Sequence, residues 1–118
     1  MRAPAREAAD RIARLTEGQS ALLGPALDAF RRRITLLEKA GVDLDHAQFS
    51  AEFGRNLEYY TGFVFELVVP ELGPKSPVAG GGRYDSLLAD VGAPRPVAAV
   101  GSCIHTERLL AVLRGAAA

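Results

Sequence analysis

The sequence predicts an α+β fold with a mainly antiparallel sheet and flanking helices. Apolar residues recur at the helical period in roughly the first third of the chain and again near its C-terminal end. Between these regions the apolar pattern changes to strict alternation or to short runs rich in β-branched and aromatic residues, which is typical of strands. The predicted order is therefore helix, helix, strands, helix, strand, helix, and this order is typical of α+β proteins.

Two helices are expected near the N-terminus. Residues 5–16 carry apolar side chains at spacings of three and four, after Pro4, which a helix start tolerates. Gly18 is expected to break this helix. Residues 25–39 repeat the pattern with one apolar face, and Gly41 follows as a C-terminal stop.

The pattern changes to strand period at residue 47. Apolar and polar residues alternate over 47–53, which predicts a half-buried strand. A turn-like join over 54–61 leads to a second predicted strand over 62–69, and we expect the two strands to pair antiparallel. A loop rich in proline and glycine ends the pairing, at Pro70, Gly73, Pro74 and Pro77.

The remaining elements are short. Residues 78–84 predict a strand thick with glycine, and 85–90 predict a brief helix. The run 97–104 is apolar throughout, which predicts a central strand buried on both faces. Thr106 is the expected cap of a last helix over 107–113.

Composition limits the classes of function. The 14 basic and 14 acidic residues give a formal net charge of zero, which argues against nucleic-acid binding by bulk electrostatics. The basic run Arg31, Arg32 and Arg33 is either a solvated helix face or a docking surface for a partner or RNA. No apolar run reaches the length of about 18 residues that suggests a membrane span, and the N-terminal residues lack the apolar core of a secretion signal. We therefore expect a cytoplasmic protein without a membrane partner.

Cysteine and histidine give no metal or cofactor signal. Cys103 is the only cysteine, so an intrachain disulfide is impossible, and its apolar neighbours predict a small core residue. His46 stands between Asp43 and Asp45, but a metal site would need more ligands in a fixed geometry. No metal and no cofactor are expected.

Two glycine-punctuated motifs are the candidate binding residues. The first is Arg-Asn-Leu-Glu-Tyr-Tyr-Thr-Gly-Phe-Val-Phe-Glu over 55–66, and the second is Ala-Gly-Gly-Gly-Arg-Tyr-Asp over 79–85. Each places an arginine and tyrosine hydroxyls beside backbone with few side chains to block it. A guanidinium can hold a carboxylate, a phenol can donate or accept a hydrogen bond, and glycine permits close approach. The combination suits a small zwitterionic ligand.

These motifs, followed by Val-Ala-Ala-Val-Gly-Ser-Cys-Ile-His-Thr-Glu-Arg-Leu-Leu over 97–110, resemble the histidine-binding signature of histidyl-tRNA synthetases and their paralogues. The resemblance covers about residues 27–114. It implies the C-terminal half of a class II aminoacyl-tRNA synthetase-like core over 25–118, preceded by an N-terminal helical segment over 1–24. It also implies that the acids with which the family holds the amino group of histidine lie outside this chain.

The resemblance assigns roles to individual residues. It implies that Arg55 supports the carboxylate of histidine and that Tyr60 and Tyr84 line the imidazole pocket. The full implied histidine-binding set is Arg55, Tyr59, Tyr60, Gly81, Gly82, Arg83 and Tyr84. Without the resemblance, Arg55 reads as an ion-pair partner of Glu52 or Glu58, and the tyrosines read as core aromatics. Adjacent Tyr59 and Tyr60 would point to opposite faces if extended. The glycine run does not fit a phosphate-binding loop, because the lysine and the following serine or threonine of that motif are missing. Asp85 is the expected cap of the helix that follows.

One departure from the family pattern concerns ATP. Synthetases have glycine before the Glu-Arg step, and that glycine leaves room for adenine; here the position is His105. We therefore expect a vestigial nucleotide site at His105, Glu107 and Arg108. No catalytic residue is expected in the chain. This profile matches the branch of the family that regulates ATP phosphoribosyltransferase in the first step of histidine biosynthesis. That branch implies L-histidine and the catalytic subunit as partners, a homo- and hetero-oligomer, and no tRNA. The alternative is a histidyl-tRNA synthetase core fragment.

Overall fold

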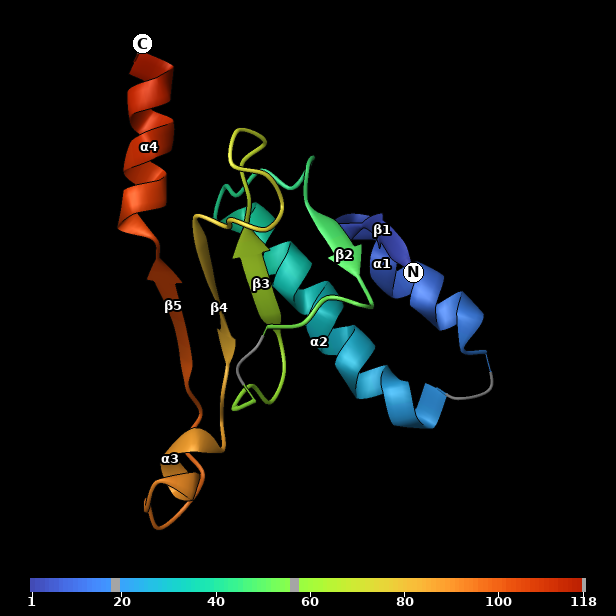
Figure 1. Ribbon diagram of the computed structural model, residues 1–118. Coiled ribbons are helices and arrows are strands. Elements are labelled where there is room, and N and C mark those ends of the chain that lie inside the picture. Colours follow the sequence, from blue (N-terminus) through green and yellow to red (C-terminus); the bar gives the residue numbers. More distant parts are fainter. Residues whose placement is uncertain (18–19, 56–57, 118) are drawn as a thin grey trace. The chain divides into compact units, whose positions relative to one another are not determined.

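The computed structural model describes residues 1–17, 20–55 and 58–117, and these form two compact units, Met1–Phe53 and Gly54–Ala118. Each unit has its own strands and helices (Figure 1). Gly18, the expected helix breaker, and Asn56 and Leu57, in the expected join, lie outside the described residues. None of the helices in the described ranges has the length and apolar character needed to cross a membrane.

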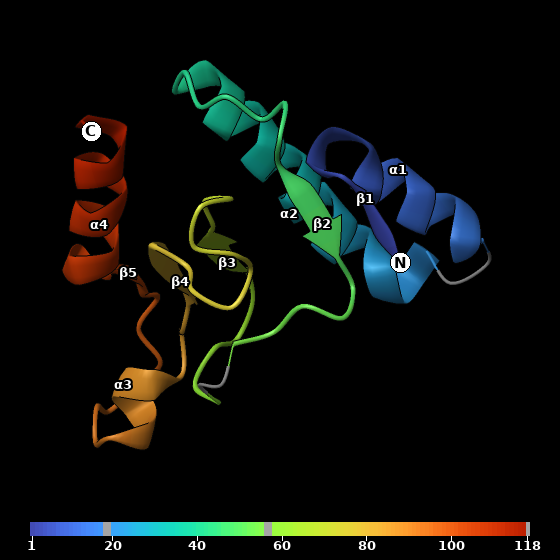
Figure 2. The same ribbon diagram turned by 45° about the horizontal axis from the view of Figure 1, so that its top comes forward.

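The first unit pairs two helices with a small antiparallel ribbon. Strand β1 (Arg2–Pro4) pairs with β2 (Gln48–Ser50), and helices α1 (Ala5–Leu15) and α2 (Ser20–Lys39) lie side by side in both views (Figures 1 and 2). The contact face of α1 consists of small buried side chains, at Ala5, Ala8 and Ala9. Small residues allow the helices to approach closely, so few large side chains are buried in this unit.

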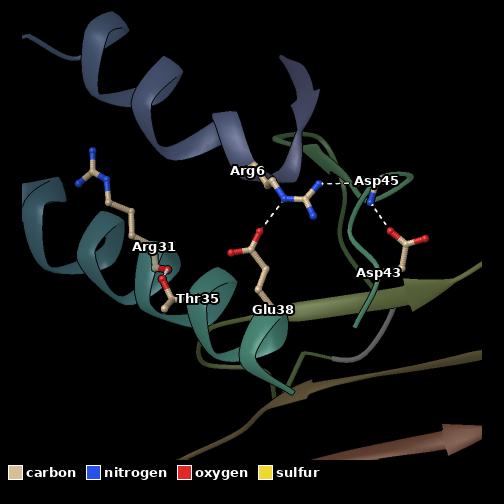
Figure 3. A network of polar contacts seen from close by, with 6 residues as sticks. All are labelled: Arg6, Arg31, Thr35, Glu38, Asp43 and Asp45. Atoms are coloured by element: carbon tan, nitrogen blue, oxygen red, sulfur yellow. Dashed lines mark hydrogen bonds and ion pairs between the residues drawn. The ribbon is translucent and has the colours of Figure 1, made fainter. Parts of the chain in front are cut away.

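Ion pairs join the two helices at their surface. The Arg6 guanidinium of α1 donates to Glu38 at 2.6 Å and to Asp45 at 2.8 Å (Figure 3). These hydrogen bonds raise the pKa of Arg6. Arg31 of α2 reaches back to Asp10 of α1 at 3.0 Å. Each pair is exposed and therefore worth little alone, but the pairs join the helices at two places, where α1 begins and near its middle.

Helix α2 begins earlier than the sequence pattern predicts. The expected start was Pro25, yet Pro25 lies inside the helix. Proline normally disfavours a helical residue before it because its ring meets the preceding Cβ. Gly24 has no Cβ, so the helix continues through this step. The predicted boundary between 1–24 and 25–118 thus falls within α2. The division into an N-terminal helical segment and part of a synthetase-like core stays a prediction.

The second unit is a three-stranded antiparallel sheet in the order β3-β4-β5 (Figure 1). Its strands are β3 (Val64–Leu67), β4 (Ala79–Arg83) and β5 (Val100–Ile104). Helix α3 (Leu87–Asp90) follows β4, and α4 (Thr106–Ala117) follows β5. The middle strand is the most buried because it has a neighbour on both sides, and its first four residues are all buried.

The α+β class and the antiparallel sheets are confirmed, but two strand predictions are wrong. The run 47–53 does not pair with 62–69: β2 pairs with β1 and ends at a turn over 51–52, whereas β3 pairs with β4. The apolar run 97–104 is not a buried central strand. Within the described chain β5 is an outer strand, with Val100 and Ile104 72% and 59% exposed.

Two side-chain predictions also fail. Cys103 was expected in the core but is exposed, because no other described element covers β5. Asp85 does not cap the short helix that follows; the residue at the cap position is Ser86, without a capping side-chain hydrogen bond. The Asp85 carboxylate instead bonds to Arg83 and to the backbone of Ala99.

Candidate functional site

The candidate site is one face of the β3-β4-β5 sheet. The strand register places Glu66, Gly80 and Cys103 in one row across the three strands. The next row contains Val64, Gly82 and Gly101. Directly paired residues share a face, and residues two apart along a strand do also. The two rows therefore form a floor that is largely bare backbone, at Gly80, Gly82 and Gly101.

Arg55 lies over the first row. Its guanidinium occupies the space that a Cβ on Gly80 would fill, and its Nη1 donates to Glu66 Oε1 at 3.1 Å. The Arg55 side chain is 12% exposed and that of Glu66 25%. The ion-pair partner is thus Glu66 rather than Glu52 or Glu58. Among the described residues, Arg55 Nε is buried without a hydrogen-bond acceptor, so this guanidinium is held in place with donor capacity left over.

Three tyrosines gather beside the second row. The Tyr60 ring would lie 2.8 Å from a Cβ on Gly82, and the Tyr84 hydroxyl lies where a Cβ on Gly101 would be. The Tyr59 ring centroid is 4.7 Å from that of Tyr60 and 5.2 Å from that of Tyr84. The chain turns at Tyr59 instead of staying extended, so the adjacent rings join one cluster. A hydrogen bond with Tyr60, followed by partial burial, raises the pKa of Tyr59.

Not every residue implied by the resemblance lies on this face. Gly81 and Arg83 alternate with Gly80 and Gly82 along β4, so they face the other side of the sheet. Arg83 Nε donates to Asp85 at 2.7 Å. The structure therefore groups Arg55, Tyr59, Tyr60, Gly82 and Tyr84, and it separates Gly81 and Arg83 from them.

Asp85 ties three segments around Tyr84. Its carboxylate accepts from Arg83 and from the Ala99 backbone N–H at 3.1 Å, and its own N–H donates to Thr61 Oγ1 at 3.0 Å. The Arg83 hydrogen bond, with a smaller contribution from the Ala99 N–H, lowers the pKa of Asp85. The backbone N–H of Tyr84 donates to the Ala99 carbonyl at 2.9 Å, so these contacts fix where the tyrosine leaves the sheet.

The three residues of the expected nucleotide site lie where β5 passes into α4. The His105 N–H donates to the Val78 carbonyl at 2.8 Å, which continues the β4·β5 register by one pair and places His105 on the face of Gly101 and Cys103. Arg108 Nη1 donates to the Pro77 carbonyl at 2.9 Å. Glu107 is exposed in the first turn of α4. In the described part of the chain, no cluster of three or more potential metal ligands occurs.

The sequence pattern of the family described as histidyl-tRNA synthetase matches residues 3–109. The chain belongs to this family. Relatives in the family include proteins named ATP phosphoribosyltransferase regulatory subunit from Agrobacterium fabrum, Allorhizobium ampelinum and a Chelativorans species. They are 50%, 42% and 36% identical over 76%, 90% and 98% of this chain. The chain spans only 24% to 30% of the length of these relatives.

A solved crystal structure from the family aligns with nearly the whole chain. That protein is named histidine–tRNA ligase subunit and comes from Alicyclobacillus acidocaldarius. The two share 36% sequence identity with a TM-score of 0.74, over 96% of this chain and 34% of that one. The α+β fold with antiparallel sheets is thus the fold of part of a family member.

Sequence reasoning assigned no binding role to three polar or glycine residues of this face: Glu66, Gly101 and Cys103. Glu66 and Gly101 lay inside the motifs but had no role, and Cys103 was placed in the core. The pairing register brings them beside Gly80 and Gly82. Register depends on contacts between distant segments, so the only local signal was that all three fall on alternate positions of predicted strands.

Proposed function

We propose that this chain is part of a non-catalytic regulatory subunit of ATP phosphoribosyltransferase, which senses histidine and activates the catalytic subunit. The observation that carries the proposal is the grouping of Arg55, Tyr60 and Tyr84 over the bare backbone of Gly80, Gly82 and Gly101. The names of the relatives support the same function.

The proposed ligand is L-histidine. A zwitterionic amino acid needs a cation for its carboxylate, and the Arg55 guanidinium provides charge-assisted hydrogen bonds. An imidazole needs partners that both donate and accept, and the hydroxyls of Tyr60 and Tyr84 can do either. Such partners also discriminate against apolar ligands of the same shape, which would leave the hydroxyls unpaired.

The second part of the proposal is that the chain does not use ATP. His105 stands where the family pattern has a glycine, and its ring would compete with adenine for the space beside β5. Arg108, which the resemblance places against a nucleotide, donates one of its N–H groups to the Pro77 carbonyl. We expect His105→Gly to raise nucleotide affinity if the site is vestigial, measured by fluorescence of a bound ATP analogue.

The same proposal covers architecture and partners. The chain would form the C-terminal part of a class II synthetase-like core, and the alignment with about a third of a solved family member supports this. A core part of this kind leaves apolar surface on β5 to be covered by another polypeptide. We expect a homo- and hetero-oligomer that includes the catalytic subunit, located in the cytoplasm and without tRNA.

Calorimetry with L-histidine tests the ligand. Binding in the micromolar to millimolar range, lost in Arg55→Ala, is the expected result. Absence of both heat and thermal shift at millimolar histidine would contradict a sensing role. Co-purification with a short-form catalytic subunit, and a histidine-dependent change in its rate, tests the regulatory role, since a ligand shifts an equilibrium only if it binds the two states differently.

A histidyl-tRNA synthetase fragment is the second candidate, favoured by the family description and by the name of the solved family member. It predicts histidine-dependent exchange between ATP and pyrophosphate in a protein that carries this chain. It also predicts that His105→Gly has little effect, because the nucleotide would already bind. Exchange activity in the unaltered protein would favour this candidate over the regulatory one.

A further inference from the structure

We propose that Glu66 is a positioning residue: it holds the Arg55 guanidinium over Gly80, where the remaining N–H groups of the arginine take the carboxylate of the ligand. Glu66 acts through Arg55 and does not contact the ligand. The inference rests on the proposed histidine site, and it gives a role to a residue that the resemblance leaves without one.

The seat of the guanidinium is the first argument. A Cβ on Gly80 would lie 2.7 Å from Arg55 Cζ, so the guanidinium fills the space that the absent side chain of Gly80 leaves free in the middle strand. The Arg55 side chain is 12% exposed. A long side chain that is buried in one place loses much rotamer freedom, so a partner at that place is needed to hold it.

The partner is the second argument. The strand register pairs Glu66 directly with Gly80, and this puts its carboxylate on the face where the guanidinium lies. Arg55 Nη1 donates to Glu66 Oε1 at 3.1 Å, and among the described residues no other acceptor bonds to Arg55. A buried cation is costly unless a counter-charge compensates it. Glu66 is therefore the group that keeps Arg55 over Gly80.

Unused donors are the third argument. The contact with Glu66 engages one nitrogen of the guanidinium, and Nε has no acceptor in the described part of the chain. A fork-like contact with both carboxylate oxygens would have engaged a second nitrogen. The one-point contact thus orients Arg55 and leaves donors for the ligand carboxylate, as a positioning residue requires.

This role predicts an effect that depends on the ligand carboxylate. L-Histidine has this group, whereas L-histidinol has a hydroxymethyl group in its place and keeps the ammonium and the imidazole. We expect Glu66→Ala to lower the preference for L-histidine over L-histidinol on the order of tenfold, the range for a lost hydrogen bond to a charged group. Loss of the negative charge by itself would raise this preference, because the site would become more cationic. Glu66→Gln keeps an oxygen acceptor for Arg55 and should therefore retain the preference.

A double-variant cycle shows whether Glu66 acts through Arg55. Arg55→Ala should remove the preference for L-histidine, and Glu66→Ala added to Arg55→Ala should change it no further. Calorimetry measures the four proteins with both ligands. An unchanged preference in Glu66→Ala, equal weakening of both ligands, or a further change in the double variant would overturn the inference.

Thermal unfolding checks that each variant is folded. If Glu66→Ala does not fold, Glu66→Asp takes its place, because it keeps the charge and withdraws the carboxylate from Arg55 by one methylene. It should lower the preference for L-histidine in the same direction, and an unchanged preference would again overturn the inference. Glu71→Ala is the matched control, at an exposed carboxylate in the β3–β4 loop of the same unit, and should leave the preference unchanged.

A readout without ligand separates this inference from the proposed function. Arg55 Nε is buried, so its N–H should exchange slowly with solvent in NMR spectra of the unaltered protein and fast in Glu66→Ala. The signal is assigned by its loss in Arg55→Ala. Slow exchange that persists in Glu66→Ala would overturn the inference, whether or not histidine binds. Protection that depends on Glu66, in a protein that binds no histidine, would support the positioning contact and contradict the proposed function.

Discussion

At the scale of single residues, the glycines of β4 differ in what a methyl group would meet. A Cβ on Gly80 would overlap the Arg55 guanidinium, which is the end of a flexible side chain, and would lie 3.1 Å from the Phe65 carbonyl oxygen. A Cβ on Gly81 would meet the Gly101 carbonyl and the Ser102 Cα, which cannot swing away. A substitution at Gly80 therefore tests the ligand site, and a substitution at Gly81 tests the stability of the sheet.

We predict that Gly80→Ala displaces Arg55 from Glu66 and weakens histidine binding at least tenfold. Gly81→Ala should instead destabilise the protein by about 1–3 kcal/mol, the usual cost of overpacking. Urea unfolding and calorimetry measure the two effects. Gly54→Ala, where nothing lies within 4 Å of the added methyl group, is the control. Equal effects of Gly80→Ala and Gly54→Ala on binding would contradict the site.

Cys103 offers a chemical probe of the same face. It is the only cysteine, it is exposed, and it lies in the row of Gly80 and Glu66. Histidine bound over this row should cover the thiol, so saturating ligand should slow its alkylation by iodoacetamide severalfold. Mass spectrometry of the single labelled site gives the rate. Arg55→Ala, which loses the ligand, should show no protection, and protection that persists in this variant would place histidine elsewhere.

At the scale of elements, local patterns predicted the helices and the positions of most strands, but not their pairing. The periodicity of 5–16 and the glycine-rich run 78–84 correspond closely to α1 and β4. The three-residue β1 is too short to give an alternation, so its pairing with β2 had no signal. The apolar run at β5 predicted burial on both faces. Burial depends on which other segments pack against a strand, and the sequence of the strand itself does not show this.

The candidate site divides in the same way. The motifs predicted that Arg55, Tyr60 and Tyr84 would converge, and the structure brings them to one face. That face includes Glu66 and excludes Gly81 because of the register between strands. A shift of one residue would have exchanged the two sets, so no local feature of the sequence could decide between them.

The junction of β4, β5 and the segment before β3 depends on Asp85, and this predicts a pH dependence. The folded-state pKa of Asp85 is lowered from 3.8 because the carboxylate accepts from Arg83 and from Ala99 N–H. Its contribution to stability is thus fully present above pH 3.8 and is lost as the pH falls through the lower folded value. The effect should be small because the side chain is exposed.

Asp85→Asn keeps a hydrogen-bond acceptor but removes the titration. We expect urea midpoints of the wild type to fall more between pH 5 and about pH 2 than those of Asp85→Asn, with the difference confined to that range. Asp90→Asn, which removes an exposed carboxylate in α3, is the control. If Asp85→Asn and the wild type lose stability in parallel, the carboxylate does not tie these elements together.

At the scale of the whole molecule, no strand within residues 1–17, 20–55 and 58–117 pairs with the outer edge of β5, so that edge is open. Ala99 and His105 bond to Tyr84 and Val78, the residues that flank β4, so along this antiparallel strand the backbone groups of Val100, Ser102 and Ile104 point outward. Folded proteins protect such edges with charges, prolines or bulges, because an open edge pairs with other strands. The five residues of β5 include no charge and no proline, and two apolar side chains are exposed there.

We therefore predict that the 118-residue chain self-associates through β5 in a concentration-dependent way, until another polypeptide covers that edge. Ile104→Lys places a charge on the exposed side of the strand and should raise the dissociation constant at least tenfold, measured by sedimentation equilibrium. Leu22→Lys, which replaces an apolar residue of α2 that is 82% exposed, should leave association unchanged. A wild-type chain that stays monomeric at high concentration would show that this edge does not drive association, and an equal effect of the two lysines would point to net charge instead.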